Sequence, residues 1–173
     1  DWVDLMIRPY APQMQGNLNV TGGTEKVKYF ISAGYFRQEG LFNNTNFVDD
    51  FDAQIKYNRY NLRSKVDFQV TKRLEISLNL GSQNERRSGQ YTDVEYLVEM
   101  IQRAAPDMSP GIVDGKLVNV KSTFHGGNPM EFLINEGYNS NTNDNFYGSV
   151  KLKHELDFIL DGLSVQGTVN YQN

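Results

Sequence analysis

The sequence predicts an all-β fold, an antiparallel up-and-down meander of about six strands. Two observations support this prediction: a hairpin from Tyr60 to Leu80 has one apolar and one polar face, and short turns alternate with long connections along the chain. The length and the aromatic ends of the strands further indicate a transmembrane β-barrel as the source of the meander. The expected strands cover about residues 15–22, 27–39, 58–70, 74–84, 146–160 and 163–172.

The hairpin from Tyr60 to Leu80 carries the clearest pattern, because its apolar residues recur at every second position. A three-residue turn, Thr71-Lys72-Arg73, interrupts the pattern. Pairing of Val70 with Leu74 across this turn keeps all apolar side chains on one face. The apolar positions are Tyr60, Leu62, Val66, Phe68, Val70, Leu74, Ile76, Leu78 and Leu80.

The other four strands alternate less regularly. The first pair is joined by a turn at Gly22–Lys26, and the second strand of that pair also carries Phe30 and Phe36 on its otherwise polar face. In the last pair, Asp161-Gly162 is typical of a two-residue type I′ turn that pairs Leu160 with Leu163. The apolar positions that alternate in these strands are Leu18, Val20, Val27, Tyr29, Ile31, Ala33, Tyr35, Phe146, Val150, Leu152, Leu156, Phe158, Leu160, Val165, Val169 and Tyr171.

Connection lengths indicate which ends of the strands face outward. The connections after the first, third and fifth strands are short turns, whereas residues 40–57 and 84–145 form long connections. Outer-membrane barrels combine tight periplasmic turns with extended extracellular loops, so both long connections are expected to be extracellular. Within the second, Thr92-Asp93-Val94-Glu95 is typical of a capping box and predicts a short amphipathic helix over residues 93–104.

The apolar face fits lipid better than a second protein layer. Ten residue steps from Tyr60 to Val70 at about 3.3 Å span roughly 33 Å, and a tilt of about 40° projects this to roughly 25 Å, the height of the apolar band of such barrels. No Lys or Arg lies on the predicted outer face, although His154 lies there between Leu152 and Leu156. The alternative is a soluble lipocalin-like barrel or sandwich, whose inner face is also apolar.

Composition excludes several classes of function. A net charge of −4 and a pI near 5.2 argue against a nucleic-acid partner, and the absence of cysteine excludes disulfides and thiolate metal sites. The sequence has no run of about 18 apolar residues, so it predicts no transmembrane helix. The start of the chain lacks the pattern of a signal peptide, and we expect a fragment of a longer protein.

Candidate chemistry is sparse. Gly22, Gly23 and Lys26 lack the spacing of a phosphate-binding loop, and His125 and His154 have no ligand spacing. Three acidic residues of the first long connection fit a solvated loop better than a cation site. They are Asp49, Asp50 and Asp52. Since no triad spacing is present either, we expect no catalytic residues, no cofactor and no metal.

Four short stretches resemble the SusC/RagA-type TonB-dependent outer-membrane transporters of Bacteroidota in their order and spacing. They are Val20–Phe30, Gly34-Tyr35 with Gln38-Glu39-Gly40, Tyr57–Ser64 and Thr71–Leu74. The resemblance covers nearly the whole chain. It implies a plugged barrel of about 22 strands that imports glycans or peptides, with a SusD-like surface lipoprotein as its lid. It also implies contact with TonB through the plug, a region that we do not find in this sequence.

Substrate contacts are expected from the larger long connection. The residues predicted for this role are Tyr91, Phe124, Phe132 and Tyr138, aided by Asn128, Asn139 and Asn141. Aromatic rings stack on sugars or on peptide side chains, but the same rings also pack a loop, and both interpretations stay open. The polar-face residues Arg59, Arg63 and Lys65 either contact the plug or are hydrated. The alternative function is a soluble β-rich module that binds carbohydrate or protein.

Overall fold

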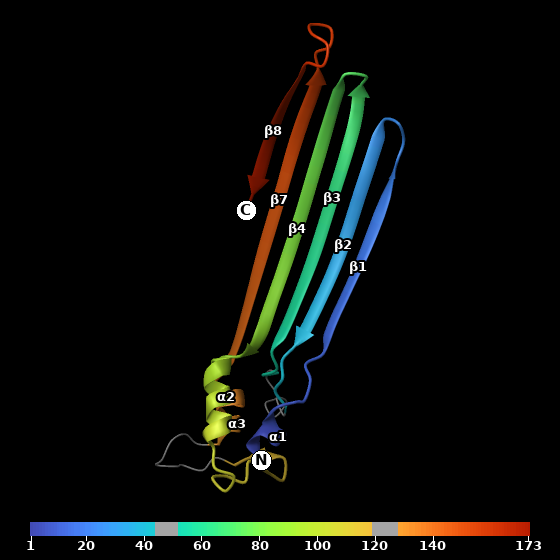
Figure 1. Cartoon of the computed structure of the whole chain (residues 1–173). Helices are drawn as coiled ribbons and strands as arrows, with labels where there is room; N and C mark the ends of the chain where they lie inside the picture. Colours follow the sequence, from blue (N-terminus) through green and yellow to red (C-terminus); the bar gives the residue numbers. More distant parts are fainter. Residues whose placement is uncertain (44–51, 119–127) are drawn as a thin grey trace. The chain divides into compact units, whose positions relative to one another are not determined.

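A six-stranded sheet is the main element of the computed structural model, which describes residues 1–43, 52–118 and 128–173. Its strand order, β1-β2-β3-β4-β7-β8, follows the sequence, so the sheet is a meander (Figure 1). The predicted all-β fold is therefore confirmed. The strands are β1 (Gln13–Gly23), β2 (Val27–Glu39), β3 (Lys56–Thr71), β4 (Leu74–Gln90), β7 (Tyr138–Glu155) and β8 (Ser164–Gln172).

The chain divides into two compact units, to which β2, β3, β4 and β7 all contribute residues. Unit 1 consists of Asp1–Gln13, Arg37–Tyr57 and Arg86–Asn141. Unit 2 consists of Met14–Phe36, Asn58–Glu85 and Thr142–Asn173. Each unit is described separately below.

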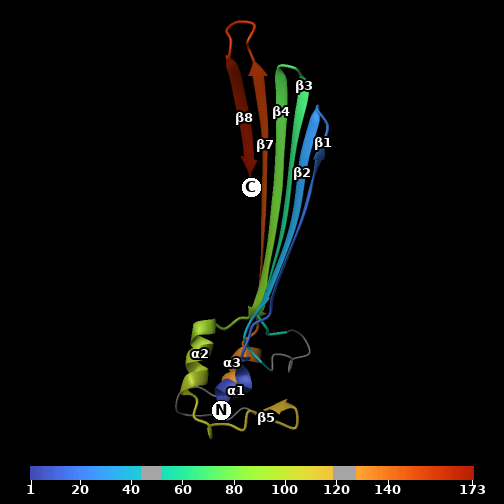
Figure 2. The ribbon, with the colours of Figure 1, turned by 45° about the vertical axis from the view of Figure 1, so that its right-hand side comes forward.

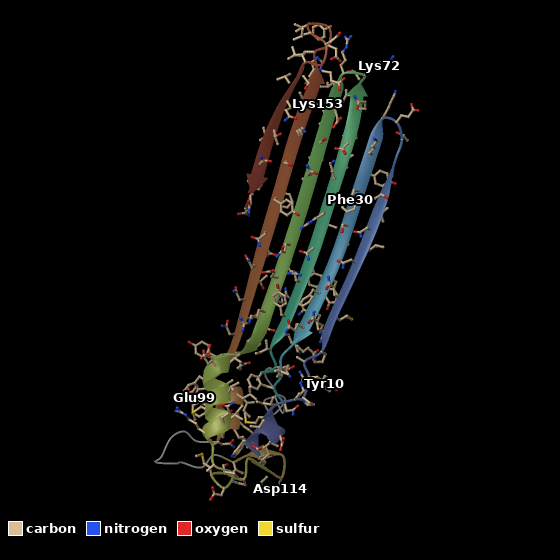
Figure 3. The ribbon with its side chains drawn as sticks, viewed as in Figure 1. Tyr10, Phe30, Lys72, Glu99, Asp114 and Lys153 are labelled. Carbon is tan, nitrogen blue, oxygen red and sulfur yellow. The ribbon has the colours of Figure 1, made fainter. Side chains whose placement is uncertain are left out.

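Unit 2 is a single layer of strands whose short turns all lie at one end of the sheet (Figure 1). Two of these turns are closed by a threonine. Thr24 Oγ1 accepts hydrogen bonds from the backbone N–H groups of Lys26 and Val27, both at 3.2 Å. Thr71 Oγ1 accepts in the same way from Arg73 at 3.2 Å and Leu74 at 3.1 Å, and Figure 3 shows the neighbouring Lys72 at this turn.

The third turn of unit 2 differs from the prediction. β7 ends at Glu155, which pairs with Ser164, so residues 156–163 join the two strands instead of a two-residue turn. Asp161-Gly162 nevertheless forms a tight turn, because Leu163 N–H donates to the Leu160 carbonyl at 3.0 Å. It is not the predicted type I′ turn, since Asp161 is not among the described residues with a positive φ. The Asp157 carboxylate also accepts a hydrogen bond from Gly162 N–H at 3.0 Å. The faces are nevertheless those expected, because Val150 pairs with Val169 and His154 pairs with Val165.

At the other end, the strands are longer than predicted. β4 extends to Gln90 instead of residue 84, and β7 begins at Tyr138 instead of residue 146, so the connection is confined to residues 91–137. The apolar alternation ends at Leu80, but the two strands continue side by side, and the side chains of Asn84 and Asp144 are hydrogen-bonded. β3 likewise begins at Lys56, before the predicted residue 58.

The described residues of unit 1 form three helices and a small hairpin around a hydrophobic core. The helices are α1 (Trp2–Met6), α2 (Val94–Arg103) and α3 (Pro129–Ile134), and the hairpin pairs β5 (Ile112–Val113) with β6 (Lys116–Leu117). α2 contacts both other helices, and Figure 2 shows the three together. The buried core residues are Trp2, Met6, Phe42, Ala53, Leu97, Ile101, Met130, Leu133 and Ile134.

The helix predicted over residues 93–104 is α2, but its cap is not the predicted one. Asp93, rather than Thr92, accepts hydrogen bonds from the first free backbone N–H groups, those of Glu95 at 2.8 Å and Tyr96 at 3.3 Å. The Thr92 hydroxyl donates instead to the Phe132 carbonyl at 2.9 Å and thereby joins the start of α2 to α3. α1 and α3 are elements that the sequence pattern did not predict.

All nine buried apolar residues of the described chain belong to unit 1. In unit 2 the apolar face, which carries Leu62, Val150 and Val169 among others, is exposed; 53% of Leu62 and 74% of Val169 are accessible. Figure 3 shows side chains projecting from the sheet without a second layer of strands over it. Among the described residues no helix is both long and apolar enough to cross a bilayer.

Candidate ligand-binding site

The site is built around Ile55, the residue that precedes β3 in unit 1. Its carbonyl accepts a hydrogen bond from Gly40 N–H at 2.8 Å, and the carbonyl of Ala53 accepts one from Gln90 N–H at 3.1 Å. Gly40 and Gly89 both lie very close to Ile55. A Cβ atom on Gly40 would lie 2.8 Å from Ile55 Cβ, and a Cβ atom on Gly89 would lie 3.0 Å from Ile55 Cα. The two glycines therefore let the Ile55 segment fit against the ends of β2 and β4.

An apolar pocket of about 660 Å³ opens beside Ile55. Val94 and Val98 line it on successive turns of α2, as expected for residues four apart on a helix. Two charged residues, Glu39 and Arg87, also line it. The remaining lining residues are Ile7, Ala11, Gln38, Gly40, Leu41, Phe42 and Tyr57.

A polar pocket of about 290 Å³ shares three lining residues, Ile55, Arg87 and Val94, with the apolar pocket, so the two adjoin. Its other lining residues come from the end of β4, the start of α2 and the start of β7. They are Ser88, Gly89, Gln90, Tyr91, Thr92, Asp93, Asn139 and Asn141.

The charges around the pockets are unequal. The Glu39 carboxylate pairs with two guanidinium groups, that of Arg37 at 2.7 Å and that of Arg8 at 3.7 Å. The exposed Arg87 guanidinium has no ion pair within the described ranges of the chain. The Glu39 carboxylate of the apolar pocket is thus already neutralised, and the polar pocket holds one cation, Arg87, and one carboxylate, Asp93, among its described lining residues.

Gln90 also lines the polar pocket, although only 7% of this residue is exposed. Its side-chain oxygen is buried and has no hydrogen-bond donor among the residues that the structure describes. Leaving a buried amide group unpaired costs about 1–3 kcal/mol.

The predicted substrate-contact residues are distributed unevenly. Tyr91 is 68% exposed and lines the polar pocket, together with Asn139 and Asn141. Tyr138 is also exposed, and it lies beside Tyr91 at the strand ends, since Tyr91 N–H donates to the Gly137 carbonyl at 3.0 Å. Phe124 lies outside the described residues, as do Asp49, Asp50 and His125.

Two predicted contact residues have structural roles instead. Asn128 is 0% exposed; its side-chain oxygen caps α3 by accepting from Met130 N–H at 3.0 Å, and its side-chain nitrogen donates to the carbonyls of Gly111 and Val118. The Asn128 side chain is thus buried and hydrogen-bonded within the protein, and its substrate contact stays a prediction. Phe132 packs against the core, with its ring edge-on to Tyr96 at a centroid distance of 6.0 Å.

Sequence reasoning did not find Ile55, Arg87 and Gln90. The stretch from Gly81 to Gln90 lacks apolar alternation, so nothing in it distinguishes a strand that lines a pocket from a solvated loop. Arg87 stands beside another arginine, Arg86, and only the fold shows that Arg87 lines the pockets and Arg86 does not.

A second polar pocket, of about 340 Å³, lies on the polar face of unit 2. Arg59 and Arg63, two members of the predicted row, line it with Asn17, Ser32 and Gln83. The Arg59 guanidinium lies 5.3 Å from the centre of the Phe36 ring, a cation–π contact that accounts for an aromatic residue on this face. Lys65 pairs with Asp67 at 2.9 Å.

Known proteins provide a further observation. The chain is 24% identical over 163 residues to TonB-dependent receptor P3 of Formosa agariphila, a match that covers 90% of this chain and 15% of that receptor. It is 31% identical over 80 residues to TonB-dependent receptor P26 of the same organism, covering 46% of this chain and 7% of that receptor. The chain is similar to TonB-dependent receptors. It spans a small part of the length of either relative, and no family model matches it.

Proposed function

We propose that this chain forms part of the barrel wall and of the substrate-side loops of a TonB-dependent outer-membrane importer of the SusC/RagA type. The importer takes up glycans or peptides, and it carries out no chemical reaction on them. The exposed apolar face of unit 2 is the observation that carries the proposal, because a single-layer sheet with such a face needs an apolar surrounding. The similarity to TonB-dependent receptors supports it.

The aromatic side chains of the apolar face agree with a membrane setting. The rings of Tyr35 and Tyr60 lie 5.1 Å apart between β2 and β3, and those of Phe146 and Tyr171 lie 6.3 Å apart between β7 and β8. Both pairs lie on the side of the strands away from the short turns. Aromatic residues at this depth are expected to lie at the lipid headgroups, with the long connections outside the cell.

Partners follow from the same proposal. The SusD-like surface lipoprotein would cover the substrate side, and TonB would act through a plug that is not among these residues. Outer-membrane lipid would surround the apolar face, and the ligand would be an oligosaccharide or a peptide. The polar face of unit 2, with Arg59 and Arg63, would face the lumen.

A matched pair of substitutions in β3 tests the orientation of the sheet. Val66→Arg in the full-length receptor places a charge on the lipid face, which costs about 2–4 kcal/mol at the middle of the bilayer. We expect loss of outer-membrane assembly, measured as the heat-modifiable band in gel electrophoresis. The control, Lys65→Ala on the polar face, removes the ion pair with Asp67 and should assemble normally. Equal assembly of both variants would contradict the orientation, and a chain that is monodisperse in buffer without detergent would favour a soluble binding module.

A further inference from the structure

Three features of unit 1 meet at one place: a pocket with mostly apolar lining, an adjoining pocket with polar lining, and at their junction the Arg87 guanidinium, which has no ion pair with any residue that the structure describes. We infer that these pockets bind the C-terminal end of a peptide, with its last side chain in the apolar pocket and its carboxylate at Arg87. The inference rests on the proposed import function and selects peptides over glycans as the ligand.

The apolar pocket selects the kind of side chain. Its volume of about 660 Å³ exceeds that of a single aliphatic or aromatic side chain, and Ile55, Val94 and Val98 provide a surface that gains by excluding water. A sugar would have to leave several hydroxyl groups without partners on such a surface, and each unpaired group costs free energy. A leucine or phenylalanine side chain has no such cost.

Arg87 selects the charge. A guanidinium forms two parallel hydrogen bonds with a carboxylate, and hydrogen bonds between charged groups are stronger than those between neutral groups. Glu39 does not compete for Arg87, because Arg8 and Arg37 already pair with it, and the Asp93 carboxylate accepts hydrogen bonds from the N–H groups of Glu95 and Tyr96. Within a peptide, only the C-terminal residue carries its α-carboxylate free beside its own side chain, so both pockets can be used at once.

The polar pocket accommodates the residues that precede the C-terminus. Peptide amides donate and accept hydrogen bonds, and the pocket offers both kinds of partner in the side chains of Asn139, Asn141 and Ser88. The exposed Tyr91 gives a surface against which the chain can pack.

Fluorescence anisotropy on the full-length receptor in detergent tests the inference. The probe is a labelled pentapeptide of glycine and serine that ends in leucine, prepared as the free acid and as the C-terminal amide. We expect the amide to bind at least about tenfold more weakly, the factor that corresponds to about 1.4 kcal/mol. Arg87→Gln should weaken binding of the free acid by the same factor and leave binding of the amide unchanged.

The neighbouring arginine provides the matched control. Arg86 is also exposed and carries the same charge, but it lines neither pocket, so Arg86→Gln should bind the free acid as the unaltered receptor does. Val98→Ser tests the apolar pocket separately and should reduce the preference for a terminal leucine over a terminal glycine. Equal affinity of free acid and amide in the unaltered receptor would overturn the inference, as would equal effects of the two arginine variants.

A neutral hexasaccharide serves as a competitor. We expect no displacement of the peptide, and displacement at similar concentrations would overturn the choice of peptide. The heat-modifiable band is measured for every protein. An unaltered receptor that is assembled in the membrane but does not bind the free acid contradicts this inference alone. An unaltered receptor that never enters the membrane contradicts the proposed function.

Discussion

The two units of this chain use their apolar residues in opposite ways. The described part of unit 1 buries nine apolar residues in a core of its own, formed by helices and short segments. Unit 2 has a comparable supply of apolar side chains, but it displays them on one exposed face of a single sheet. Burial away from water stabilises both arrangements, so unit 2 must obtain from its surroundings what unit 1 obtains from itself.

The same substitution in the two units measures this difference most directly. Leu97 in the core of unit 1 is 0% exposed, and Leu97→Ala should destabilise unit 1 by about 2–5 kcal/mol because it leaves a cavity. Leu62→Ala on the apolar face of unit 2 should cost about 1 kcal/mol or less, because under the proposed function lipid fills the space that the side chain leaves. Hydrogen exchange measured by mass spectrometry on the full-length receptor gives the result for peptides of each unit.

Faster exchange in residues 93–103 of the Leu97→Ala receptor, with little change in residues 58–70 of the Leu62→Ala receptor, would support the comparison. A large loss of protection in both would mean that a protein layer covers the apolar face of unit 2. That result would favour the soluble alternative over the lipid-facing wall.

The contrast between the units also explains which parts of the fold could be predicted from the sequence. In unit 2 the decisive signal is local: alternation from Tyr60 to Leu80 identifies strands, faces and turn without reference to distant residues. The local signal at Asp161-Gly162 correctly marks a tight turn, but this turn lies within a connection of residues 156–163 and does not join the two strands directly. The extension of β4 to Gln90 depends on pairing with neighbouring strands, and residues 81–90 show no apolar alternation from which it could be predicted.

In unit 1 the decisive contacts are distant. Its core joins Trp2, Phe42, Leu97 and Met130, which come from separate segments of the chain, and no periodicity links them. The candidate site shows the same limit. Its exposed residues Tyr91, Asn139 and Asn141 were predicted from residue type, whereas Arg87 and Gln90 became recognisable only when the fold brought the strand ends together.

A second prediction compares two glycines of β1 and tests how unit 2 is held together without a core. A Cβ atom on Gly23 would lie 2.3 Å from the Val27 carbonyl oxygen and 2.8 Å from Lys28 Cα, so Gly23→Ala forces the backbone of the turn apart. We expect a cost of about 1–3 kcal/mol, the usual range for overpacking. A Cβ atom on Gly16 meets nothing within 4 Å, and Gly16→Ala should change little.

Hydrogen exchange of residues 13–39 provides the measurement for these glycine variants. If turns and backbone pairing dominate the stability of this edge of the sheet, Gly23→Ala should raise exchange throughout the first hairpin and Gly16→Ala should not. Similar exchange in both variants would show that the hairpin does not depend on its tight turn.

The smallest expected effect concerns the cap of α2, which orients Val94 and Val98 towards the apolar pocket. Asp93→Ala leaves the N–H groups of Glu95 and Tyr96 without their acceptor and should cost about 1 kcal/mol, whereas Asp93→Asn retains a capping oxygen and should cost little. The measurement is amide exchange in the first turn of α2. Thr92→Ala distinguishes the observed cap from the one that the sequence predicts: it should loosen the link to Phe132 without exposing those two amides. Faster exchange of the Glu95 and Tyr96 amides in Thr92→Ala than in Asp93→Ala would restore Thr92 as the cap, and it would mean that local sequence governs unit 1 as closely as it governs unit 2.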